Sequence, residues 1–168
     1  LINDGPDVLI GSPPCTDWSP PMDRNLPKMD PKEVEKRVRE AKVHLEFCMK
    51  LYKIQHEAGR YFLHEHPAKA TSWSNTKVRE VMNLPGVSKV TSHMCAFGMK
   101  QEDKDGPGHI YKPTGFMSNS ECLLERLSRK CPRNHRHIAL VGGRAERAAI
   151  YPEGLCLEII RGIVDQFK

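Results

Sequence analysis

The sequence predicts an α/β domain in which a long helix joins two parallel strands. Asp7-Val-Leu-Ile10 is a short apolar run that ends at Gly-Ser-Pro-Pro, which indicates a buried strand opening into a loop. Apolar side chains then recur at helical spacing as far as residue 58. Arg60-Tyr-Phe-Leu-His64 predicts the next strand. A strand, a helix and a second strand in this order form a crossover unit.

Capping residues mark both ends of the predicted helix. Asp30 precedes Pro31, and Glu33 follows three residues after the aspartate. This is an N-cap with proline at the first helical position and a capping-box acid. Ala58-Gly59 provides a stop at the carboxyl end. We therefore expect a helix from residue 31 to about residue 58.

The second half of the chain predicts further strands and helices in one domain. We expect a helix over 74–82, a strand over 87–97, a charged loop over 100–108, a strand over 109–117, a helix over 119–130, a strand over 137–141 and a final helix from Pro152. That last helix should pack on the core through Leu155, Ile159, Ile160, Ile163 and Phe167. No repeat or linker divides residues 1–168, so we expect a single domain.

The composition is typical of a globular protein of the cell interior. Apolar residues make up 39% and charged residues 28% of the chain, with no long apolar run, so we expect no membrane contact. The six cysteines are dispersed without a CxxC pair. This pattern favours reduced thiols and an intracellular, nuclear or cytoplasmic location.

The basic residues predict a polyanionic partner. The formal net charge is +5, and lysines and arginines supply most of the non-specific affinity for nucleic acids. Clusters that could form one basic face are residues 126–130 with Arg133 and Arg136, and the pair Arg144 and Arg147. An ordinary solvated surface explains each cluster equally well.

The ends of the first two predicted strands carry residues that suit chemistry. In parallel sheets, ligands bind at the carboxyl ends of the strands, where Cys15 follows one strand and Glu65 and His66 follow the other. A thiolate is the reactive form of cysteine, and a loop leading into a helix is where its pKa can be lowered. Glu65 could exchange a proton with whatever the thiolate attacks. A structural role, with Cys15 as a small buried residue, remains an alternative.

Three groups of motifs carry a resemblance to a known family. Ser12-Pro-Pro-Cys-Thr-Asp-Trp-Ser19 resembles the catalytic loop of the cytosine-C5 DNA methyltransferases, a Pro-Cys with an aromatic residue three positions on and a serine at the fourth. Phe62-Leu-His-Glu-His-Pro67 resembles their Glu-Asn-Val or Glu-Asn-Pro segment. Met94-Cys-Ala-Phe-Gly98, Lys112-Pro-Thr114 and Ser118-Asn119 are similar to patterns of phage-type relatives and of methyltransferase-like domains in retroelement polyproteins. The resemblance covers nearly the whole chain.

The resemblance implies a partial Rossmann-like fold of the class I methyltransferase type and a defined chemistry. The target cytosine of DNA would be flipped out of the duplex. Cys15 would add to its C6, Glu65 would protonate or hydrogen-bond N3, and C5 would accept a methyl group from S-adenosylmethionine. Pro14 would shape the loop and form part of the cofactor site, and Ser19 would support the loop.

The chain also departs from the family pattern. His66 stands in place of the usual asparagine, so the hydrogen bond that fixes the Pro-Cys loop must be remade by an imidazole or lost. No Gln-x-Arg-x-Arg segment occurs, which leaves Lys112, with Thr114 in the same motif, and Arg144 and Arg147 as substitutes for its DNA contacts.

The sequence contains no glycine-rich strand-turn-helix for the cofactor. Gly142-Gly143 lies late in the chain and is typical of a turn. We therefore expect the carboxyl-terminal part of a catalytic domain that needs an upstream part of the same polypeptide and does not transfer a methyl group alone.

Three alternatives stay open. Cys131, His135 and His137 could bind a metal with Cys95 or His93 as fourth ligand, but the spacing is not a standard zinc frame, and we favour ordinary basic-loop histidines. Cys15 with His64 or His66 could form a cysteine hydrolase, although no oxyanion hole is identifiable. A nucleic-acid-binding remnant without turnover is the third alternative.

Overall fold

The main sheet is a four-stranded mixed sheet. The computed structural model describes residues 5–19, 28–141 and 143–168. The strand order is β1 (Val8–Gly11), β2 (Tyr61–Pro67), β6 (Pro113–Ser118) and β3 (Ser88–His93). β1 and β2 pair in parallel, whereas β6 is antiparallel to both of its neighbours. β3 consequently runs in the same direction as β1 and β2.

The predicted crossover helix is confirmed. α2 spans Pro31–Glu57 and joins β1 to β2. The carboxylate of Asp30 accepts hydrogen bonds from the backbone N–H groups of Lys32 and Glu33, at 2.8 and 3.4 Å. The helix therefore begins where the capping residues predict it, because these side-chain bonds satisfy N–H groups that have no partner inside the helix.

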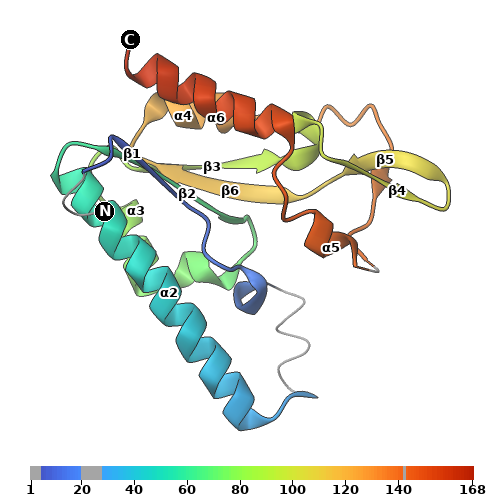
Figure 1. Cartoon of the computed structure of the whole chain (residues 1–168), viewed down its shortest axis with the longest axis horizontal. Coiled ribbons are helices and arrows are strands. Elements are labelled where there is room, and N and C mark those ends of the chain that lie inside the picture. Colours follow the sequence, from blue (N-terminus) through green and yellow to red (C-terminus); the bar gives the residue numbers. More distant parts are fainter. Residues whose placement is uncertain (1–4, 20–27, 142) are drawn as a thin grey trace.

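Helices cover both faces of the main sheet. α2 and α3 (Thr76–Met82) lie on one face, and α4 (Glu121–Leu127) and α6 (Glu153–Gln166) lie on the other (Figure 1). Each face has its own apolar core. Tyr52 of α2 packs with Phe62 and Met117 of the sheet on one face, and Leu123 of α4 packs with Phe116 on the other.

A second, three-stranded sheet differs from the prediction. The segment expected as a loop over 100–108 forms the hairpin β4 (Lys100–Asp103) and β5 (Gly106–Ile110), and β7 (His137–Ile138) pairs in parallel with β5. Gly106 takes the left-handed backbone conformation (φ 94°) that the tight turn requires. The expected strand over 109–117 is divided between β5 and β6, and the strand expected over 137–141 has only two residues.

The expectations for the final helix and for the segment before it need correction. On α6, Leu155 and Ile159 are buried as predicted, but Ile160 and Phe167 are 57% and 54% exposed. The buried face of α6 runs instead through Glu158 and Gly162. Gly162 lies close to Leu123 on α4, which leaves no room for a side chain there. A short helix that the sequence did not predict, α5 (Arg144–Arg147), precedes α6.

Among the described residues, no helix combines the length and apolar character that a bilayer crossing requires.

Candidate active site

Parallel pairing brings the Pro-Cys loop against the end of β2. Gly11 lies opposite His64 in the register. The sequence places Glu65 and His66 after the second strand, but β2 continues to Pro67, so both residues lie within β2 just beyond the end of β1. The hydroxyl of Ser12 donates a hydrogen bond to Oε2 of Glu65 over 2.5 Å. The two segments that the sequence predicts to face one site are therefore in direct contact.

Glu65 is a buried carboxylate with one oxygen held and the other without a partner. Glu65 is only 5% exposed to solvent. Oε2 accepts from Ser12 and from the hydroxyl of Tyr151, the latter over 3.0 Å. Oε1 is buried and has no hydrogen-bond partner among the described residues. Because buried polar groups are nearly always hydrogen-bonded, an oxygen of this kind suits a donor that a ligand brings.

His66 fixes the backbone of the Pro-Cys loop. Its Nε2 lies 3.2 Å from the carbonyl oxygen of Pro13, and its Nδ1 lies 2.5 Å from the hydroxyl of Ser72. Since a carbonyl can only accept, Nε2 carries the proton and Nδ1 accepts from Ser72. Burial lowers the pKa of His66, which favours this neutral tautomer. The imidazole thus remakes a hydrogen bond to the loop.

The electrostatic setting of Cys15 differs from the prediction. Burial, and to a smaller extent the Glu65 carboxylate, raise the pKa of the thiol, while Lys112 lowers it. The expected lowering by a helix is absent because the helix that follows is one 3-10 turn of three residues, Thr16–Trp18. Lys112, and to a smaller extent a backbone hydrogen bond, lower the pKa of the thiol and so favour the thiolate.

The remaining residues of the predicted loop and motif have supporting positions. Nζ of Lys112 donates to the carbonyl oxygen of Ala148 over 2.9 Å, directly after α5, which carries Arg144 and Arg147. Thr114 is buried on β6 opposite Pro67. Ser19 donates to the carbonyl oxygen of Thr16 over 2.8 Å and so supports the turn. Pro14 is exposed.

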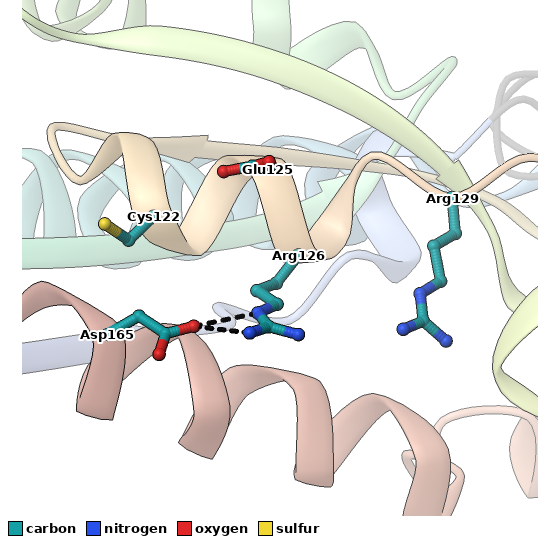
Figure 2. A pocket seen from close by; sticks show the side chains of 5 residues that line it. All are labelled: Cys122, Glu125, Arg126, Arg129 and Asp165. Atoms are coloured by element: carbon teal, nitrogen blue, oxygen red, sulfur yellow. Dashed lines mark hydrogen bonds and ion pairs between the residues drawn. The ribbon is translucent and has the colours of Figure 1, made fainter.

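The basic clusters do not form one unpaired face. Arg126 pairs with Asp165, and Arg129 extends from the end of α4 toward the same surface pocket (Figure 2). Arg129 also pairs with Glu158, which is 2% exposed. Arg136 instead pairs with Asp103 on the second sheet. The guanidinium groups of Arg126, Arg129 and Arg136 are thus paired with carboxylates of the same chain.

The candidate metal ligands converge away from Cys15. The ligand atoms of Cys95, Cys131, His135 and His137 all lie within 4.8 Å of one another. His93 is not among them: its Nδ1 accepts from the backbone N–H of Cys131 over 2.9 Å. The structure therefore distinguishes between the two candidates for a fourth ligand and selects Cys95.

The described residues do not fit S-adenosylmethionine by themselves. Doubly wound folds hold such ligands at a glycine-rich turn between strand and helix, whereas the turn after β1 contains Pro13, Pro14 and Cys15. Glu65 Oε1, which has no partner among the described residues, can accept a hydrogen bond from one donor of a ligand.

The sequence missed Tyr151 and Ser12 as partners of Glu65. Ser12 belongs to the quoted loop motif, so its nearness to Glu65 could have been inferred from the crossover. Tyr151 lies 86 residues from Glu65, and no local pattern connects the two.

Comparison of the chain with protein-family models, curated proteins and solved structures finds no match.

Proposed function

We propose that this chain carries the base-activating part of a cytosine-C5 DNA methyltransferase-like domain. The thiolate of Cys15 adds to C6 of a cytosine that has left the base stack, and the electron pair moves to C5. As the thiolate adds, Oε1 of Glu65 delivers a proton to N3, which is an acceptor in neutral cytosine, and the carboxylate that remains accepts a hydrogen bond from the exocyclic amino group. S-adenosylmethionine would supply the methyl group, held by residues beyond those described.

The single observation that carries this proposal is the state of Glu65. In a buried carboxyl group whose Oε2 is fixed by Ser12 and Tyr151, and whose Oε1 has no described partner, Oε1 is left to exchange a proton with N3 and to accept from the amino group of the base. Ser12 ties this carboxylate to the loop of Cys15. The nucleophile and the base-contacting group are therefore held in one rigid unit, as attack at C6 with simultaneous contact at N3 requires.

The hydrolase alternative loses support from the same geometry. Both ring nitrogens of His66 are engaged, by Pro13 and Ser72, and His64 is buried with its Nδ1 3.2 Å from the hydroxyl of Tyr52. Burial lowers the pKa of His64 to about 3. Neither imidazole is therefore placed to take the thiol proton of Cys15, as a cysteine hydrolase requires.

Isotope exchange at C5 tests the proposal without a cofactor. Addition of the thiolate to C6 makes C5 basic, so that it takes a solvent proton; elimination of the thiolate then releases the original hydrogen. We expect oligonucleotides with tritium at cytosine C5 to release tritium to water in the presence of the chain. Cys15→Ser should abolish release, and the exposed Cys156→Ser should not change it.

An electrophilic base provides an independent measurement. A single-stranded oligonucleotide that contains pyrimidin-2-one in place of cytosine should form a covalent adduct, located by peptide mass spectrometry at Cys15. A folded chain that binds the oligonucleotide yet gives neither exchange nor adduct would exclude base activation. Salt-sensitive binding that Cys15→Ser leaves intact would then identify a nucleic-acid-binding remnant.

A further inference from the structure

Four ligand atoms on three separate segments meet at one point beside the second sheet. Cys131 Sγ lies 3.5 Å from Nε2 of His135 and 3.3 Å from Nε2 of His137, and the two Nε2 atoms lie 3.0 Å apart. Zinc–sulfur bonds of about 2.3 Å and zinc–nitrogen bonds of about 2.0 Å, at tetrahedral angles, separate sulfur from nitrogen by about 3.5 Å and nitrogen from nitrogen by about 3.3 Å. The observed separations match this arrangement.

We propose that Cys95, Cys131, His135 and His137 bind one zinc ion in a closed tetrahedral site. Two thiolates and two imidazoles are a donor set that zinc favours over magnesium or calcium. All four positions are filled by protein groups, which leaves none for a substrate or a water molecule. The site is therefore structural and lies outside the base-activating site proposed above.

Neighbouring groups already orient the ligands. The backbone N–H of Arg133 donates to Cys131 Sγ over 3.3 Å, and Arg133 holds a left-handed conformation (φ 58°) that is unfavourable for a side chain of this type. Nδ1 of His135 lies 3.2 Å from the side-chain oxygen of Asn134. Because that oxygen accepts, the proton sits on Nδ1 and the lone pair of Nε2 points toward the ion. The ring of His109 stacks on His135 at 3.9 Å.

The ion would fasten a weakly supported part of the fold. Cys95 belongs to the 3-10 turn Met94–Phe97 that follows β3, and it is 4% exposed. Cys131 and His135 lie in the irregular segment after α4, and His137 begins β7, which has two residues. Few backbone hydrogen bonds hold that segment, so metal coordination would supply the missing restraint between the two sheets.

Metal content and spectroscopy of the purified chain test the proposal. Purified under reducing conditions, the chain should contain one equivalent of zinc by mass spectrometry. Exchange for Co²⁺ should give the intense visible bands of tetrahedral coordination and a thiolate-to-cobalt charge-transfer band in the near ultraviolet. Cys131→Ser and His137→Ala should each weaken zinc binding at least tenfold in competition with a chelator. Cys122→Ser and His44→Gln, which change the same residue types elsewhere, should retain full binding.

A variant that keeps four metal ligands tests the proposal even if the other variants fold poorly. His137→Cys preserves four ligands, so it should bind Co²⁺ with a charge-transfer band stronger than that of the parent chain. A folded parent chain that takes up no zinc, or whose Co²⁺ spectrum is the weak one of octahedral coordination, would overturn the proposal. Unchanged zinc affinity in both Cys131→Ser and His137→Ala would also overturn the proposal. None of these results depends on whether Cys15 activates cytosine.

Discussion

The hydroxyl of Tyr151 donates a hydrogen bond to Oε2 of Glu65 over 3.0 Å, although the two residues are 86 positions apart in the chain. Tyr151 lies in the connection between α5 and α6, and Glu65 lies on β2. The segment that precedes the last helix therefore completes the surroundings of the carboxylate. Ser12 donates a hydrogen bond to the same oxygen.

Replacement of Tyr151 by phenylalanine should weaken both the fold and the site. The variant removes one donor from a buried carboxylate, so the free energy of unfolding should fall by about 1–2 kcal/mol. Tritium release from cytosine C5 should slow about tenfold, equivalent to about 1.4 kcal/mol in the barrier. Tyr61→Phe, which removes a hydroxyl bonded to Gln166, is the control: it should cost similar stability with no change in exchange. Equal exchange rates for both variants would contradict a role of Tyr151 in holding Glu65.

Charge changes around Cys15 should move its alkylation profile in opposite directions. Lys112 lowers the pKa of the thiol and Glu65 raises it. Lys112→Met should therefore shift the midpoint of iodoacetamide labelling at Cys15 to higher pH, and Glu65→Gln should shift it to lower pH. Peptide mass spectrometry distinguishes Cys15 from the other five cysteines. Lys104→Met, an exposed change in the β4–β5 turn, should leave the midpoint unmoved.

His64 should make the protein less stable in acid. Burial lowers the pKa of His64 to about 3 from an unfolded value of 6.5. Between these values the unfolded chain binds the additional proton, so stability falls as the pH falls below 6.5. The loss attributable to this residue between pH 6.5 and pH 5 should be about 1–2 kcal/mol, because the unfolded imidazole is already half protonated at pH 6.5. Urea unfolding at both pH values should show a smaller pH dependence for His64→Gln than for the exposed His44→Gln; identical pH dependence would contradict the assignment.

The backbone of Gly11 approaches Tyr52 too closely for any side chain. A Cβ at Gly11 would lie 1.9 Å from the hydroxyl oxygen of Tyr52 and 2.9 Å from the ring carbon that bears it. Gly11→Ala should therefore destabilise the fold by about 1–3 kcal/mol through overpacking. In a Tyr52→Phe background the same change should cost less, because the nearest atom is gone. Additive costs in a double-mutant cycle would show that this contact is not the cause.

The crossover unit could be predicted because its signals are local. Asp30, Pro31 and the spacing of apolar residues specify α2 within a single segment, and the apolar runs specify β1 and β2. The position of β6 could not be predicted in this way. It pairs Phe116 with Glu65 on one side and with Val90 on the other, and such pairings depend on long-range packing rather than on neighbours in the sequence.

The second sheet could not be predicted from the composition of its strands. Residues 100–108 are largely charged or glycine, which predicts a loop. β4, however, is an edge strand, where charged side chains can face solvent, and it pairs with β5 at the centre of the sheet. For the candidate site, the motifs identified Cys15, Glu65 and His66. The raised pKa of Cys15 could not be read from them, since it depends on burial and on the balance between Lys112 and Glu65.

Lys112 gives the two proposed sites a shared support. Its ammonium group favours the Cys15 thiolate and binds the Ala148 carbonyl, while its own carbonyl oxygen accepts the backbone N–H of Met94, the neighbour of Cys95. A turn loosened by loss of zinc would release one anchor of this lysine. Preparations that differ in metal loading should then differ in thiol reactivity, and metal content becomes a quantity to report beside every rate measured at Cys15.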